Sequence, residues 1–175
     1  MASTLKVDTI QTNDGTGTIA LQNQLSGMTT ASVPTLTSAH MPTGSVLQVV
    51  YGSNATVTNS TSSSYVSTGI TATITPKFAS SKIFVLTKMT ARGTASTDVN
   101  TKIYKGSSSI TSKASTKYNS QASEPSDMVN THLDSPNTTS ATTYTLYAQS
   151  SVNGQTITMK DGASEGTITL MEIAG

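Results

Sequence analysis

Short segments in which apolar and polar residues alternate constrain the fold of this chain more than any other feature. Seven of them are good β-strand candidates, at residues 46–52, 64–75, 81–91, 99–106, 142–150, 155–160 and 166–173. Weaker candidates lie at about residues 55–59, 109–115 and 127–133. Turn-forming residues such as Gly52 and Asn153-Gly154 separate the segments, and no helical period is present. The pattern predicts an all-β chain folded as an antiparallel β-sandwich, jelly roll or barrel.

Alternation within the segments predicts which side chains face the core. In residues 71–75, Ala72 and Ile74 point away from the threonines between them. The same spacing opposes Tyr144, Leu146 and Ala148 to Thr143, Thr145 and Tyr147. Near the C-terminus it opposes Ile168, Leu170 and Glu172 to Thr167, Thr169, Met171 and Ile173. We therefore expect outward-facing rows that are rich in threonine.

Hydroxyl residues replace charged ones throughout the chain. Threonine and serine occupy 61 of the 175 positions, whereas charged residues make up 11% and the formal net charge is +1. So small a charge gives no general attraction to nucleic acid or to an anionic membrane, and neither is expected as a partner. Charged side chains are also the usual protection of exposed strand edges. Their scarcity here predicts that edges are covered by assembly with other molecules.

The N-terminal part is expected to be organised differently from the rest. Residues 5–12 and 18–25 read as two strands around the Asn13–Gly17 turn, which gives a β-hairpin within residues 1–27. Residues 28–44 contain two prolines and no periodicity, as in an extended linker, and residues 45–175 form the sandwich. An isolated hairpin is marginally stable in water. It should therefore pack on another surface.

Charge is unevenly distributed along the chain. Residues 77–117 contain eight cationic side chains and one aspartate, whereas residues 118–175 contain six acids and one lysine. Three readings are open: solvated strand faces, pairing between the basic part of one copy and the acidic part of the next, or binding of a polyanionic glycan or nucleic acid by the basic stretch. Residues 111–131 look like a long loop, and such loops tend to be functional. Lys113, Lys117 and Tyr118 are its candidate partner-binding residues.

No pattern of catalytic residues is present in the sequence. The histidines are His40, in the linker, and His132, which lies two residues before Asp134 and so on the same face of a strand. That pair lacks a third metal ligand or a nucleophile motif. The chain has no cysteine, no apolar run long enough to cross a bilayer and no secretory signal. We expect no enzyme activity, no catalytic residue, no metal site and no cofactor.

Three pieces of the chain carry a family resemblance: MASTLKVDTIQTNDGTGTIALQNQLSG at 1–27, MPTGSVLQVVYG and the following strands at 41–91, and GTITLMEIAG at 166–175. They resemble tail-fibre-like appendage proteins of tailed phages, especially those of marine bacteria and cyanobacteria. The resemblance implies a homotrimer that is anchored to a socket protein of the virion by its N-terminal segment. It also implies a jelly-roll-like sandwich displayed outward. The implied docking contacts are the apolar residues Leu5, Val7, Ile10, Ile19, Leu21 and Leu25.

The expected function is a short, fibre-like virion appendage that contributes to adsorption on a host surface glycan or other receptor. Such a protein would be assembled in the host cytoplasm and located in the virion. The absence of a long repetitive shaft keeps a second reading open, a capsid decoration or head-fibre protein bound to the major capsid lattice. A separate carbohydrate-binding module is less favoured, because the eight aromatic residues are spread thinly along the sequence.

Overall fold

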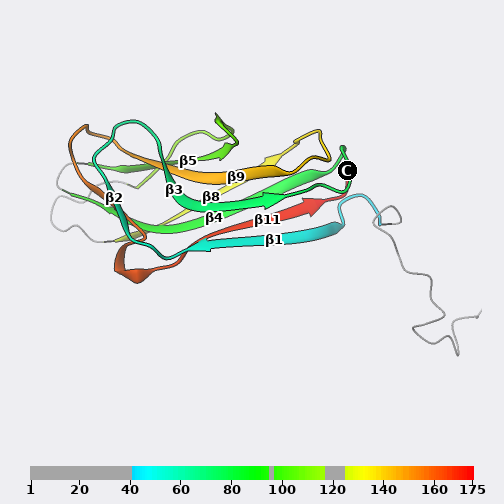
Figure 1. Ribbon diagram of the computed structural model, residues 1–175, viewed down its shortest axis with the longest axis horizontal. Coiled ribbons are helices and arrows are strands. Elements are labelled where there is room, and N and C mark those ends of the chain that lie inside the picture. The colour runs from blue at the N-terminus through cyan, green and yellow to red at the C-terminus, as the bar shows by residue number, and fades with distance from the viewer. Residues whose placement is uncertain (1–40, 95–96, 117–124) are drawn as a thin grey trace, which may run out of the picture. The chain divides into compact units, whose positions relative to one another are not determined.

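The computed structural model describes residues 41–94, 97–116 and 125–175. Within these ranges the protein is an all-β sandwich of two antiparallel sheets, and no α-helix occurs (Figure 1). The described residues contain no helix of the length and hydrophobicity needed to cross a membrane. The predicted hairpin 1–27, its six docking residues and the linker up to residue 40 lie outside the described residues.

The first sheet has six strands. Its long strands are, in spatial order, β1 (Val46–Asn54), β11 (Gly166–Ile173), β4 (Lys82–Gly93) and β8 (Ser126–Asp134). Two short strands complete it, β2 (Thr58–Ser60) and β10 (Ile157–Met159). Because β10 pairs with the end of β4 beyond β11, β10 and β11 together line one edge of β4, and β8 lines the other.

The second sheet has five strands. They are β3 (Val66–Ile74), β9 (Thr142–Ser150), β5 (Val99–Lys105), β6 (Ser108–Ser109) and β7 (Ala114–Thr116). Both short strands, β6 and β7, pair with β5 on the side away from β9. A single 3₁₀ turn, η3 (Asp161–Ala163), connects β10 to β11.

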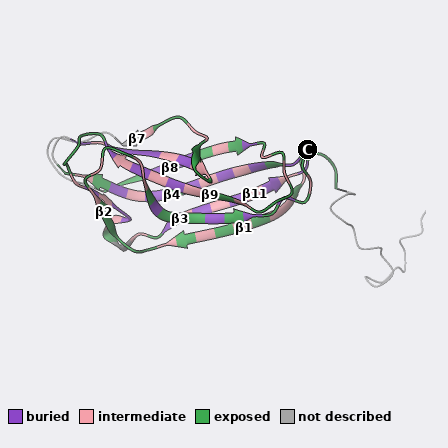
Figure 2. Ribbon diagram, turned by 45° about the horizontal axis from the view of Figure 1, so that its top comes forward, coloured by how far each residue is buried: buried purple, intermediate pink, exposed green. Residues whose placement is uncertain are grey.

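The core lies between the two sheets and follows the predicted alternation. Along β3 every second side chain is buried, including Ala72 and Ile74 (Figure 2). The predicted inward sets of β9 and β11 are also confirmed, and Glu172 is fully buried among them. Aliphatic and methionine side chains dominate the interior, with Tyr144 as its largest member.

The sheets come close together at Gly52 of β1. A Cβ atom at this position would lie 2.2 Å from the backbone oxygen of Thr71 on β3, which is far inside van der Waals contact. The residue therefore has to be glycine for the two backbones to approach as they do.

The predicted long loop at 111–131 is wrong for much of its length. Residues 114–116 form β7, and residues 126–131 belong to the nine-residue strand β8. Strand β8 was only a weak candidate because its inward-facing side chains include Asn130 and Asp134. These polar groups form hydrogen bonds with residues of the opposite sheet. The inner face of the strand is therefore buried although the sequence shows no apolar alternation there.

Candidate functional site

Hydroxyl groups line the outer face of the second sheet. Thr71 on β3 and Thr145 on β9 face each other with their Oγ1 atoms 2.8 Å apart, and Thr73 and Thr143 do so at 2.7 Å. The predicted threonine-rich outward row is therefore confirmed on this sheet. Such rows keep a strand well formed while presenting polar groups to water.

Three tyrosines gather beside these hydroxyls on the same face. The rings of Tyr104 on β5 and Tyr147 on β9 are stacked, with centroids 4.1 Å apart and an angle of 28° between their planes. Tyr65, directly before β3, tilts against Tyr104 at a centroid distance of 6.2 Å. We call these residues, Tyr65, Tyr104 and Tyr147, the tyrosine cluster. It joins three neighbouring strands of one sheet.

The cluster has one cationic neighbour, Lys102 on β5. Its ammonium nitrogen lies 5.0 Å from the centroid of the Tyr65 ring, within the range of a cation–π interaction. Strands β3, β9 and β5 contain one other ionisable side chain besides tyrosine, Lys105, which pairs with Asp134. The outer face of these three strands thus carries a single positive charge and no carboxylate.

The tyrosine cluster is partly exposed, with polar tips free. All three side chains are of intermediate exposure, and burial, followed by the nearby Tyr104 hydroxyl, raises the pKa of Tyr65. Within the described ranges, none of the three phenol oxygens makes a hydrogen bond to another residue. Buried or interfacial tyrosine hydroxyls usually have a partner. The described residues supply these three partly exposed hydroxyls with no partner.

The outer face of the first sheet has the opposite character. In register across four strands lie Val49, Met171, Phe84 and Leu133. Neighbouring rows add further apolar side chains, and together these residues form what we call the apolar face: Val46, Val49, Tyr51, Phe84, Leu86, Val129, Leu133, Met171 and Ile173. Val49, Tyr51 and Leu133 are 57%, 58% and 49% exposed.

The prediction of threonine-rich outward rows is thus wrong for the first sheet. Its threonines, such as Thr169 on β11, are interleaved with larger apolar groups on the adjacent strands β1 and β4. A free surface of this kind leaves apolar area in water at a cost of about 25 cal/mol per Å². Burial of the face against another molecule would recover that free energy.

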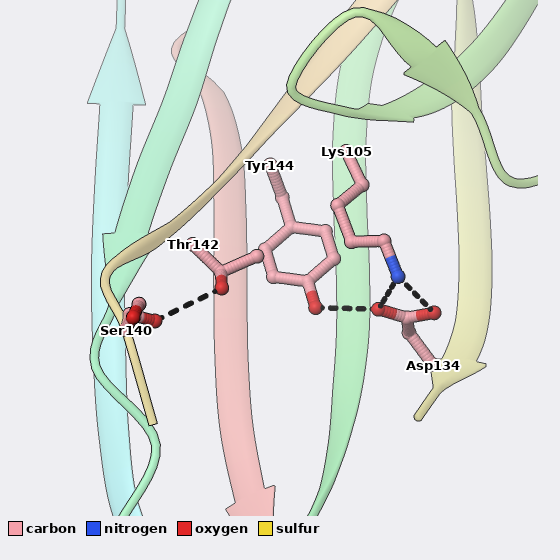
Figure 3. A network of polar contacts seen from close by, with 5 residues as sticks. All are labelled: Lys105, Asp134, Ser140, Thr142 and Tyr144. Atoms are coloured by element: carbon pink, nitrogen blue, oxygen red, sulfur yellow. Dashed lines mark hydrogen bonds and ion pairs between the residues drawn. The ribbon is translucent and has the colours of Figure 1, made fainter. Parts of the chain in front are cut away.

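A polar network inside the sandwich joins the two sheets (Figure 3). Asp134 on β8 accepts hydrogen bonds from Lys105 Nζ at 3.0 and 2.9 Å and from the Tyr144 hydroxyl at 2.7 Å. Asp134 belongs to the first sheet, whereas Lys105 and Tyr144 belong to β5 and β9 of the second. Burial, and then the hydrogen bond to Asp134, raise the pKa of Tyr144 well above its usual range. The network is structural, since it holds β8 in place.

Glu172 is a second buried carboxylate with several donors. Its oxygens accept hydrogen bonds from Gln48 Nε2 at 2.6 Å and from the backbone N–H of Lys77 at 2.6 Å and Phe78 at 3.4 Å. Burial by itself would raise the pKa of Glu172, but the hydrogen bonds from Gln48 and from the two backbone N–H groups outweigh it and lower the pKa below its ordinary value. The group is ionised at neutral pH and anchors the loop after β3.

A groove of about 400 Å³ lies between residues 110–114 and strand β8. Lys113, one of the sequence-predicted residues, lines it opposite His132. Lys117 and Tyr118 lie outside the described residues. Asp134 pairs with Lys105 and Tyr144 rather than taking part in a metal site with His132, and no group of three potential metal ligands occurs in the described ranges.

Three of the cationic side chains in residues 77–117 pair within the chain. Lys88 lies 3.1 Å from Asp127, Arg92 lies 2.9 Å from Asp161, and Lys105 lies 2.9 Å from Asp134. The basic middle and acidic end of the sequence therefore neutralise each other in part inside one copy.

No protein-family model and no curated protein matches the chain. Its function therefore has to be inferred from the residues and their geometry.

Proposed function

We propose that this protein is a structural component of a tailed-phage virion, a short homotrimeric appendage that exposes its β-sandwich toward the host. The observation that supports the proposal most is the apolar face of the first sheet. It gives the sandwich one surface suited to assembly and leaves the hydroxyl-rich surface for display. The N-terminal segment 1–27 would dock the trimer on a socket protein, as the sequence resemblance implies.

The strand order supports a jelly-roll-like form of the sandwich. If β2 is counted with β1, β7 with β6, and β11 with β10, the chain has eight strand positions. We number these positions from first to eighth along the chain. Across the first sheet they then lie in the order first, eighth, third, sixth, and across the second sheet in the order second, seventh, fourth, fifth. This is the order of a jelly roll, an architecture found in viral capsid proteins and lectins.

The occupant that we propose for the apolar face is a second copy of this chain. Four strands at ~4.8 Å spacing, over about six residues each, give roughly 400 Å² in projection, an area that the apolar side chains share with Lys82, Thr131 and Thr169. Patches of this size on a single chain are often functional. In a trimer each copy would turn this face toward the threefold axis and bury it against the two neighbouring copies. Strands β1 and β8, at the two edges of the same sheet, would be covered together with it.

Replacement of two exposed apolar residues by threonine tests this assembly. Threonine keeps the strand propensity, so Val49→Thr with Leu133→Thr removes apolar contact without disturbing the sheet. A matched control changes Val57 and Val152, which are 46% and 43% exposed and lie off the apolar face, to threonine. We expect light scattering at micromolar protein to give a trimer for the wild type and the control and a lower mass for the test variant. A monomeric wild-type protein would contradict the proposal.

A capsid decoration or head-fibre protein is the second candidate. The apolar face favours it equally, because the face could pack on a capsid lattice instead of on another copy. The number of copies per virion separates the two functions, since tail appendages are few and capsid decorations are many.

A further inference from the structure

The tyrosine cluster combines three features that suit one kind of ligand. It offers aromatic surface from three adjacent strands, free phenol hydroxyls, and a border of threonine hydroxyls at Thr71 and Thr145. The pattern is unlike a core, because the rings lie on the outer face of the sheet. It is also unlike the apolar face of the first sheet, where large apolar side chains, most of them aliphatic, are spread over four strands.

Sugars present the complementary surface. A pyranose ring has one face made of C–H groups, which carry partial positive charge and pack on the negatively charged faces of aromatic rings. Its rim carries hydroxyls that exchange hydrogen bonds with tyrosine, threonine and serine side chains. A sheet face that places aromatic rings beside hydroxyls can therefore bind a sugar chain.

The charge on the outer face of the second sheet further restricts the class of ligand. Lys102 supplies one ammonium group beside Tyr65, and the outward positions of β3, β9 and β5 supply no carboxylate. A carboxylated sugar would meet an attractive charge here and no repulsive one. A nucleic acid would be held by many phosphate contacts, and this face has only one cation to make them.

We propose that the outer face of the second sheet binds an acidic surface polysaccharide, with the outward surface of the tyrosine cluster packing on its pyranose rings and Lys102 pairing with a uronate carboxylate. This deepens the proposed function, because it names the substrate class that the displayed surface would recognise on a host. The binding itself is a property of the sandwich. The conclusion that it serves adsorption rests on the proposed virion role.

The test uses the full chain on an array of bacterial capsule and lipopolysaccharide O-antigen oligosaccharides, both neutral and uronate-containing, with titration calorimetry on those that bind. We expect binding to uronate-containing chains, about tenfold weaker in Tyr147→Ala. Lys102→Gln should weaken binding of the same chains about threefold at low salt and abolish the preference over neutral chains. Val57→Ala, an exposed apolar residue between β1 and β2 that lies on neither outer face, is the control and should bind as the wild type does.

Three results would overturn the proposal: no binding to any probe, equal binding by Tyr147→Ala, or loss of binding in Val57→Ala. Far-ultraviolet circular dichroism of each variant shows whether the sheet is intact. Should Tyr147→Ala unfold, Tyr147→Leu keeps an apolar side chain at the position and is expected to show the same loss. Light scattering on the same samples distinguishes the glycan-binding proposal from the assembly proposal. A trimer that binds no glycan refutes only the glycan-binding proposal. A glycan-binding monomer refutes only the assembly.

Discussion

Removal of one buried hydroxyl, in Tyr144→Phe, should weaken the contact that ties strand β8 to the second sheet. The Tyr144 ring is fully buried and stays in place as phenylalanine, so no cavity beyond one oxygen atom is created. What is lost is a 2.7 Å hydrogen bond to a carboxylate that is itself 8% exposed. The perturbation therefore isolates a single polar contact.

The expected cost follows from the charge on the acceptor. A hydrogen bond to an ionised group contributes about 1.5–3 kcal/mol, and a buried acceptor that loses its donor bears a desolvation cost. Asp134 keeps both contacts with Lys105 Nζ, at 2.9 and 3.0 Å, which places the loss near the lower half of that range. We expect the free energy of unfolding to fall by about 2 kcal/mol, or Tm by about 4–8 °C.

Urea unfolding followed by circular dichroism measures this change. The midpoint should fall while the m-value stays constant, and protein concentration has to be matched because assembly adds to apparent stability. Tyr147→Phe is the control, since its hydroxyl has no partner in the described residues and its loss should cost under about 0.5 kcal/mol. A Tyr144→Phe variant that unfolds within 0.5 kcal/mol of the wild type would refute the reasoning.

Two further substitutions test other parts of the sandwich. The pKa of Glu172 is lowered in the folded protein, so its stabilising contribution is complete above its ordinary value of 4.5 and is lost as pH falls through the folded pKa. Glu172→Gln should therefore lower stability at pH 7. It should also reduce the fall of the urea midpoint between pH 7 and pH 3, and an unchanged fall would contradict this. Gly52→Ala places a Cβ 2.2 Å from the Thr71 oxygen and should cost about 2–4 kcal/mol. Gly106→Ala, at φ +56° with open space around it, should cost about 1 kcal/mol in the same thermal melts, and equal costs would show that the sheets can move apart.

The sequence was sufficient to predict those strands in which alternation and β propensity agree. Strands β9 and β11 begin and end at the predicted residues, and even the buried position of Glu172 follows from the period of two. Burial of that carboxylate is possible because backbone N–H groups from a distant loop, at Lys77 and Phe78, converge on it. The alternation predicted that Glu172 faces the core, but it did not predict which groups donate hydrogen bonds to it.

Strand β8 shows where local patterns stop being informative. Its inward side chains include Met128, Asn130 and Asp134, so the strand reads as polar and irregular. Asn130 exchanges hydrogen bonds with Thr101, at 3.2 and 3.1 Å, and Asp134 pairs with Lys105. Both partners come from β5, which lies in the other sheet. Their pairing depends on tertiary contact, and a strand stabilised in this way has no short-range signal.

The tyrosine cluster was missed for a related reason. Tyr65, Tyr104 and Tyr147 are far apart in the sequence, which made the aromatic residues look thinly spread. The pairings of β3 with β9 and of β9 with β5 bring them to one face, and a shift of one residue in either register would turn a ring to the opposite side. A candidate binding surface of this kind depends on register.

The two outer faces together imply an orientation for the assembled protein. If the apolar face is buried between copies, the second sheet, on the other side of each sandwich, is the surface left to face outward. The tyrosine cluster and its threonine border then lie where a ligand from outside the assembly can reach them. The opposite arrangement would place nine apolar side chains in water and bury free phenol hydroxyls, which is unfavourable for both surfaces. The same distribution of side chains thus links assembly to display. A variant that disrupts the apolar face should leave the glycan affinity of each chain unchanged and lower the avidity for a multivalent surface.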